Sequence, residues 1–242
     1  MNNNRGFVLM GFCLFLPLLI VLFLGSHFIL WFSSQKQNWE NICHEHVLKS
    51  QQALVQGNQQ ILALNPIAEG YILAHKRLNK LIRTGKPPIV AAALALKAIV
   101  TGLQVKLQAK QTLLKESHHT LARSYLYILR QRFYSHVKQM ARSLGSKSQG
   151  YGHIKVYFKR SKLQPKKRSI APPYRRPLTI QRTQAHRVQY FVPINHLLPH
   201  WIKQYFSFRG SWKGECWSHP HQVKGGKHWL ASIGKGNHSL NF

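Results

Sequence analysis

The stretch that decides the fold is FVLMGFCLFLPLLIVLFLGSHFILWF, which runs from Phe7 to Phe32. Its 26 residues include no Lys, Arg, Asp or Glu. As an α-helix rising about 1.5 Å per residue, the stretch reaches about 39 Å, whereas the hydrocarbon core of a bilayer is about 30 Å thick. The sequence therefore predicts one transmembrane helix over residues 7–32, preceded by a short cytoplasmic segment over residues 1–6.

A cleaved secretory signal is the alternative reading of this stretch. Such signals have an apolar region of about 7–15 residues before a cleavage site of small residues. Here apolar residues resume directly after Gly25 and Ser26, and Arg5 is the only charged side chain before the stretch. Both features favour an uncleaved anchor. Arg5 then stays in the cytoplasm with the amino terminus, and the rest of the chain is exported.

The charge balance of the chain is extreme. Its 242 residues contain 35 Lys and Arg against five acidic residues, all of them Glu, for a net charge of +30. Such a chain attracts an acidic envelope partner or a polyanion such as nucleic acid or lipopolysaccharide. Most hydrolytic and metal-assisted sites need carboxylates as bases or ligands. We therefore expect no catalytic residues, no cofactor and no enzymatic activity.

The three cysteines differ in their predicted surroundings. Cys13 lies inside the apolar stretch, whereas Cys43 and Cys216 follow it and are expected on the exported side. In an oxidising compartment, a Cys43–Cys216 disulfide would tie the C-terminal region to the start of the helical region. Two free thiols are the alternative.

Two short runs of Cys and His raise the question of a metal site. They are Cys-His-Glu-His at residues 43–46 and Cys-Trp-Ser-His-Pro-His at residues 216–221. Neither has the paired spacing of zinc knuckles, nor two ligands four residues apart on one face of a helix. No metal site is predicted.

Residues 33–145 are predicted to be helical. A break is expected at Asn65-Pro66, because the residue before a proline disfavours the α-helical conformation. Thr84-Gly85-Lys86-Pro87-Pro88 indicates a turn. The long helix expected over residues 89–144 carries an apolar residue every seven positions, but the second apolar column of a coiled coil is missing. We expect an antiparallel helical hairpin, with residues 89–100, too short to span a membrane, as a buried helix.

Residues 146–242 are predicted to form a small, basic and aromatic-rich β-type region after a linker at residues 145–150. Residues 153–159 and 188–193 mix β-branched and aromatic residues as strands do. The Pro-rich and basic residues 162–187 are predicted to be a flexible arm. This arm contains the candidate polyanion-binding residues, which are Lys166, Lys167, Arg168, Arg175 and Arg176. An arm that only stays solvated is the alternative. The fold class is thus α+β.

The N-terminus carries a family resemblance. Arg5-Gly6, Phe12 and the run Leu16-Pro17-Leu18-Leu19 stand at the spacings of the TadE/TadG-like minor pseudopilins of tight-adherence (Flp) pili. The resemblance covers about 15 residues, and Gly11 stands where the family usually carries Glu. It implies processing between Gly6 and Phe7, and contact with other pilin-like or membrane helices.

The resemblance and the residues together lead to one expected function. We expect a non-enzymatic protein anchored once in the bacterial cytoplasmic membrane, with most of the chain on the periplasmic or extracellular side, that assists pilus assembly. The alternative is a membrane-tethered protein that binds DNA or lipopolysaccharide.

Overall fold

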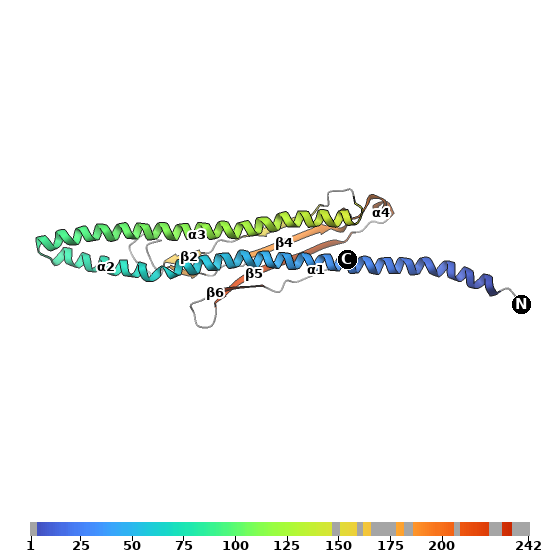
Figure 1. Ribbon diagram of the computed structural model, residues 1–242, viewed down its shortest axis with the longest axis horizontal. Helices are drawn as coiled ribbons and strands as arrows, with labels where there is room; N and C mark the ends of the chain where they lie inside the picture. Colours follow the sequence, from blue (N-terminus) through green and yellow to red (C-terminus); the bar gives the residue numbers. More distant parts are fainter. Residues whose placement is uncertain are drawn as a thin grey trace. The chain divides into compact units, whose positions relative to one another are not determined.

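The computed structural model describes residues 4–146, 151–158, 162–165, 178–181, 186–205, 209–222 and 229–233. By its internal contacts the chain divides into two units, Met1–Ile42 and Cys43–Phe242. Most of the described chain is helical, and a small antiparallel sheet forms in its C-terminal part. This arrangement agrees with the predicted α+β class (Figure 1).

The first unit consists of the N-terminal part of helix α1, which extends from Asn4 to Ala63. No break separates the apolar stretch from the polar residues that follow it. Pro17 lies inside the helix, where it removes one backbone hydrogen bond. The apolar stretch and the start of the predicted helical region are therefore parts of one helix.

In the second unit, the remainder of α1 is followed by α2 (Asn65–Thr84) and α3 (Pro87–Ser143). Pro66 lies in the first turn of α2, where the missing N–H of a proline is tolerated. At the end of α2, the Gly85 N–H bonds to the carbonyl oxygen of Leu81 at 2.8 Å, and Pro87 then begins α3. Figure 1 shows α2 and α3 running side by side from this turn. The predicted break, turn and helical hairpin are confirmed.

Helix α3 buries a different face from the one that the seven-residue pattern marks. Leu107 is buried, but Leu121 is 43% and Ile128 is 42% exposed. From Gln104 to the end of α3, the buried positions follow the 3.6-residue period of a straight helix. They are Gln104, Leu107, Gln111, His119, Ala122, Leu126, Leu129, Phe133, Val137, Met140 and Ala141.

The prediction that residues 89–100 form a buried helix is wrong. Ile89, Leu94, Leu96 and Ile99 are all about half exposed or more, from 47% to 59%. Helix α3 also continues far beyond this segment, to Ser143. An apolar run predicts burial only where another part of the structure packs against it, and the run itself does not show whether such a neighbour exists.

The main sheet has four antiparallel strands in the order β1-β4-β5-β6. Its strands are β1 (His153–Tyr157), β4 (His186–Pro193), β5 (Ser211–Gln222) and β6 (Trp229–Ile233). Between β4 and β5 lie a 3₁₀ turn, η2 (Ile194–His196), and the short helix α4 (His200–Tyr205). Strands β1 and β4 lie where the sequence predicts strands.

Two further strands lie within the predicted arm. Strand β2 (Lys162–Pro165) pairs antiparallel with β3 (Leu178–Gln181), and β4 begins at His186. The expectation of a loop over all of residues 162–187 is therefore wrong where these strands form, whereas the flexibility of the arm stays a prediction. The strands pair with residues far away in the chain, and composition alone does not indicate such pairing.

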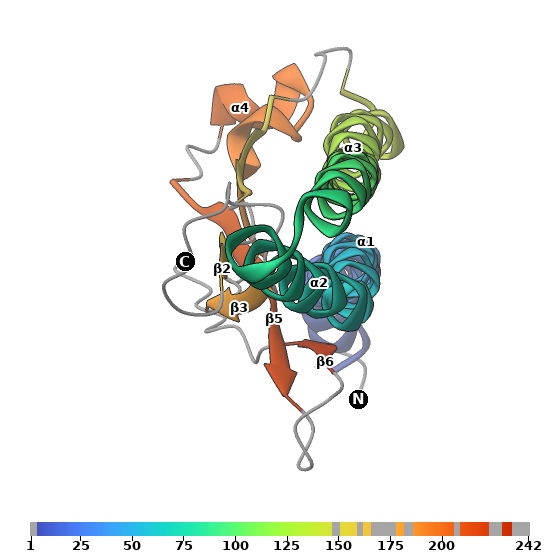
Figure 2. The same cartoon turned by 90° about the vertical axis from the view of Figure 1, so that its left-hand side faces the viewer.

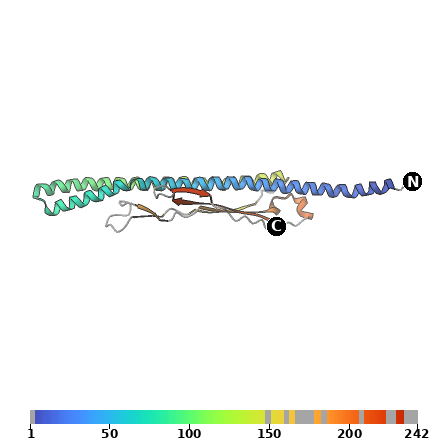
Figure 3. The same cartoon turned by 90° about the horizontal axis from the view of Figure 1, so that it is seen from below.

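One face of the main sheet packs on the helices of the second unit (Figure 2). Along β4, His186, Val188, Tyr190 and Val192 are buried, and the residues between them are more exposed. The Tyr190 ring lies 6.2 Å from the Phe133 ring of α3 and 5.3 Å from the Trp212 ring of β5. The strands follow the helices as a second layer (Figure 3).

Candidate functional site

The predicted processing residues, Gly6 and Phe7, both lie in the first turns of α1. From Phe12 to Leu30, the large apolar side chains that the structure describes are exposed. Those that the structure describes as large and exposed are Phe12, Phe15, Leu16, Leu18, Leu19, Ile20, Val21, Leu22, Phe23, Leu24, Phe28, Ile29 and Leu30. A helix that is apolar on all sides and leaves these side chains uncovered is typical of a segment that meets lipid.

Two helices in the described part of the chain, α1 and α3, are long and apolar enough to cross a membrane. This statement rests on length and composition alone, and core helices of soluble proteins pass the same test. In the most apolar part of α1 no described residue is buried, and in that of α3 11% of the residues are buried. The prediction of a single span therefore stays a prediction.

Cys43 and Cys216 are joined in a disulfide, with their Cα atoms 6.0 Å apart. Cys43 lies on α1 and Cys216 lies on β5, where it pairs with Val188 of β4. The bond links positions 173 residues apart. Such a link removes a large part of the freedom of the unfolded chain. Cys13 is a free cysteine.

Beside the disulfide, buried serines connect the sheet to the helices. The Ser218 hydroxyl of β5 donates to the carbonyl oxygen of Val47 on α1 at 3.1 Å. The Ser50 hydroxyl of α1 donates to the carbonyl oxygen of Ala122 on α3 at 2.9 Å. Its oxygen also lies 3.0 Å from Nδ1 of His186 on β4. These contacts hold α1, α3 and the sheet together around the disulfide.

The Ser50–His186 pair resembles the nucleophile and base of a hydrolase, but its surroundings favour a structural role. Both side chains have no exposed surface, so a substrate has no route to the hydroxyl. The chain has no Asp to orient the imidazole. The hydroxyl serves instead to satisfy polar groups in the layer between helices and sheet.

His46 lies on the same segment of α1 and is also buried. Burial lowers the pKa of its imidazole, because the charged form loses its hydration, and the positive charge of Arg132 lowers it further. The negative charge of Glu45 raises this pKa, but by less than burial and Arg132 lower it. We therefore expect the folded protein to hold His46 neutral near pH 7.

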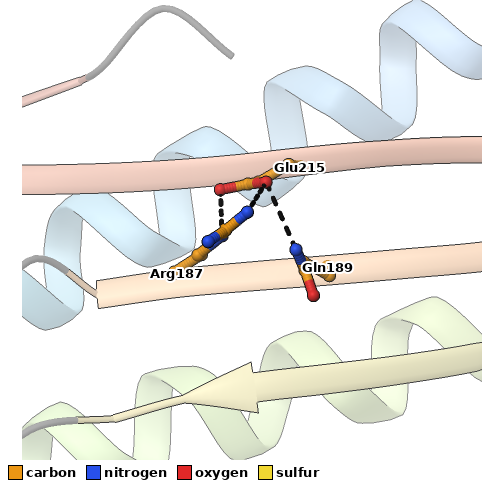
Figure 4. Close-up of polar contacts among 3 residues, drawn as sticks. All are labelled: Arg187, Gln189 and Glu215. Carbon is orange, nitrogen blue, oxygen red and sulfur yellow. Dashed lines mark hydrogen bonds and ion pairs between the residues drawn. The ribbon is translucent and has the colours of Figure 1, made fainter. Parts of the chain in front are cut away.

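The outward side of the main sheet carries an ion pair between Arg187 of β4 and Glu215 of β5 (Figure 4). Gln189 Nε2 also donates to a Glu215 oxygen, at 3.4 Å. The hydrogen bond to Glu215 raises the pKa of Arg187 above its usual value. Glu40 and Glu45 likewise pair with Lys36 and Lys49 on α1. Three of the five carboxylates of the chain are therefore held by neighbouring basic groups.

The remaining predicted site residues are Lys166, Lys167, Arg168, Arg175 and Arg176, and they lie outside the described residues. Within the described ranges, no three His, Cys, Asp or Glu side chains gather as a metal site. The sequence did not predict the buried polar residues of this layer, which are Ser50, Ser218 and His186. In the sequence, Val188, Tyr190 and Val192 recur at every second position, and this period places His186 on the same side of the strand. No such pattern marks the two serines.

Comparisons with known proteins found no family model, no curated protein and no solved structure that matches this chain.

Proposed function

We propose that this chain is a single-pass, membrane-anchored protein of the bacterial envelope that assists pilus assembly without catalysing a reaction. The observation that carries the proposal is the charge-free stretch of α1 over residues 7–32, which continues as helix to Ala63. The large apolar side chains that the structure describes in this stretch, from Phe12 to Leu30, are exposed. The proposed role in pilus assembly is based on the resemblance of residues 5–19 to TadE/TadG-like pseudopilins. The anchor would contact other pilin-like helices in the inner membrane.

The disulfide supports export of the second unit. Structural disulfides persist in the periplasm and outside the cell but are rare in the cytoplasm. Cys43 lies eleven residues after Phe32, so a disulfide at Cys43 requires that the chain leave the cytoplasm soon after the anchor. This orientation also keeps Arg5 on the cytoplasmic side.

Flotation of membranes in a density gradient tests the anchor, because aggregated protein does not float. We expect the full chain to float with membranes after extraction with alkaline carbonate. The double variant Leu19→Arg with Leu22→Arg should no longer float, since each arginine raises the free energy of membrane insertion by about 2.5–3.5 kcal/mol at the centre of a span. The control, Leu19→Val with Leu22→Val, should float as the parent does. Flotation of the arginine variant at the parental level would contradict the proposal.

A fusion of alkaline phosphatase after Phe242 tests the orientation, because this reporter is active only when it is exported. We expect activity in a bacterial host. An inactive fusion on a chain that still floats with membranes would contradict export while leaving the anchor intact.

A membrane-tethered polyanion-binding protein is the second candidate, and the net charge of +30 favours it. Binding through clustered Lys and Arg releases counterions, so it weakens steeply as salt rises. We expect the detergent-solubilised full chain to bind DNA or lipopolysaccharide at low salt. Lack of binding even at low salt would remove this candidate.

A further inference from the structure

The end of the helical hairpin, defined as residues 65–110 of α2 and α3, exposes many large apolar side chains. They are Ile67, Leu73, Leu81, Ile89, Leu94, Leu96, Ile99, Leu103 and Val105. Their exposed fractions range from 39% to 59%. Soluble proteins rarely leave so many neighbouring apolar side chains uncovered unless something binds them.

The exposed apolar residues of α3 occupy more than one side of the helix. Leu96, Ile99 and Leu103 follow each other at intervals of three and four residues and share one side. Leu94 and Val105 are eleven residues apart, about three turns, and share a different side. A partner helix or groove would need a single stripe. The end of a hairpin that enters a lipid layer, in contrast, buries apolar side chains on several sides at once.

The hairpin end is also strongly basic. It carries eight Lys and Arg against one acidic residue, Glu69, and the eight are Lys76, Arg77, Lys80, Arg83, Lys86, Lys97, Lys106 and Lys110. The ion pairs found among the described residues all lie elsewhere, on α1 and on the main sheet. Clusters of Lys and Arg beside an apolar surface are attracted to the anionic headgroups of a membrane.

We propose that the hairpin end binds the surface of an anionic phospholipid bilayer. Its apolar side chains enter the boundary between headgroups and acyl chains, and its Lys and Arg side chains contact the lipid phosphates. A second copy of the chain is disfavoured as the occupant, because two such basic ends repel each other. This binding is separate from the anchor in α1. Flotation after extraction with alkaline carbonate reports the anchor alone, because this extraction releases proteins that are bound only to the membrane surface.

A fluorescent probe on a single cysteine tests this proposal in the full chain. With Cys13→Ser as background, Cys43 and Cys216 stay in their buried disulfide, so only an added cysteine is labelled. Ile99→Cys places an environment-sensitive dye on the hairpin end, and Tyr127→Cys provides the control. The two native side chains are similarly exposed, at 59% and 64%, and both lie on α3.

The labelled chains are reconstituted in vesicles that contain phosphatidylglycerol, with a spin-labelled quencher lipid either in these vesicles or in vesicles added later. We expect the dye at position 99 to emit at shorter wavelength and to be quenched several-fold more than the dye at position 127. The location of the effective quencher tells whether the hairpin end binds its own membrane or another. Equal emission and equal quenching at the two positions, with both quencher placements, would overturn the proposal.

Lipid charge and salt separate surface binding from the other possibilities. We expect quenching at position 99 to fall several-fold in pure phosphatidylcholine and at about 0.5 M salt, where charges are screened within a few ångström. Lys80→Glu with Arg83→Glu should have the same effect, whereas the control Lys138→Glu should not. Quenching at position 99 that does not change with salt or lipid charge would indicate that α3 spans the membrane. A shift of the emission to shorter wavelength without quenching would indicate that a second copy of the chain covers the hairpin end. Either result overturns the proposal.

Discussion

At the residue scale, Gly214 shows how closely the sheet packs. Gly214 on β5 pairs with Tyr190 on β4, and a Cβ at position 214 would overlap the Tyr190 ring. Tyr190 cannot move aside easily, because it is 3% exposed and contacts Phe133 and Trp212. We expect Gly214→Ala to lower the free energy of unfolding by about 1–3 kcal/mol, measured by denaturant unfolding in detergent.

Gly102 provides the matched control for this substitution. It lies inside α3, and a Cβ there meets nothing within 4 Å. Gly102→Ala should stabilise the protein by roughly 0.5–1 kcal/mol, because alanine favours a helix interior more than glycine does. If both substitutions changed the stability equally, steric overlap at Tyr190 would not be the cause.

His46 predicts how stability depends on pH. Its folded-state pKa is lowered by burial and by Arg132 from the ordinary value of 6.5. As pH falls below 6.5, the unfolded chain takes up a proton that the folded chain does not, so the free energy of unfolding falls until pH reaches the lowered pKa. We expect the melting temperature to fall between pH 7 and pH 5, and His46→Gln to reduce this fall. Identical pH profiles for parent and variant would contradict this account.

At the element scale, the helix ends were predictable and the buried faces were not. Pro66, Gly85 and Pro87 act locally on the backbone, so their effect on α2 and α3 follows from the sequence. Burial depends instead on which element lies opposite. The sheet and α1 cover α3 near Ala122 and Phe133, and they lie far from it in the sequence.

Two leucines of α3 test which face packs. Leu126 is 4% exposed, whereas Leu121, in the seven-residue column, is 43% exposed. We expect Leu126→Ala to cost about 2–5 kcal/mol of stability and Leu121→Ala roughly 0.5 kcal/mol or less. Denaturant unfolding of the two variants measures the difference. A larger loss for Leu121→Ala would mean that the heptad column forms the packing face after all.

At the scale of the whole molecule, the sequence indicated Cys43 and Cys216 as a candidate pair but not what surrounds them. The candidate followed because only these two cysteines lie beyond the apolar stretch. The buried contacts of Ser50 and Ser218 beside the disulfide depend on the sheet register, which pairs Ser218 with His186. No local pattern in the sequence determines that register.

The disulfide is expected to contribute strongly to stability. Removing a native disulfide typically costs about 2–5 kcal/mol. The parent should therefore show a mobility shift between reducing and non-reducing electrophoresis, and Cys216→Ser should show none and should melt at a lower temperature. Cys13→Ser is the control and should behave as the parent. A parent without a shift would mean that Cys43 and Cys216 are free thiols.

The central claim is that the apolar stretch over residues 7–32 remains in the mature protein as its membrane anchor. Mass spectrometry of the mature N-terminus, on protein extracted from membranes, tests it most directly. We predict that the mature chain begins at Met1 or at Phe7, and a start at Phe7 would add the processing that the pseudopilin resemblance implies. A mature chain that begins near His27 would contradict the claim, because the stretch would then be a cleaved signal.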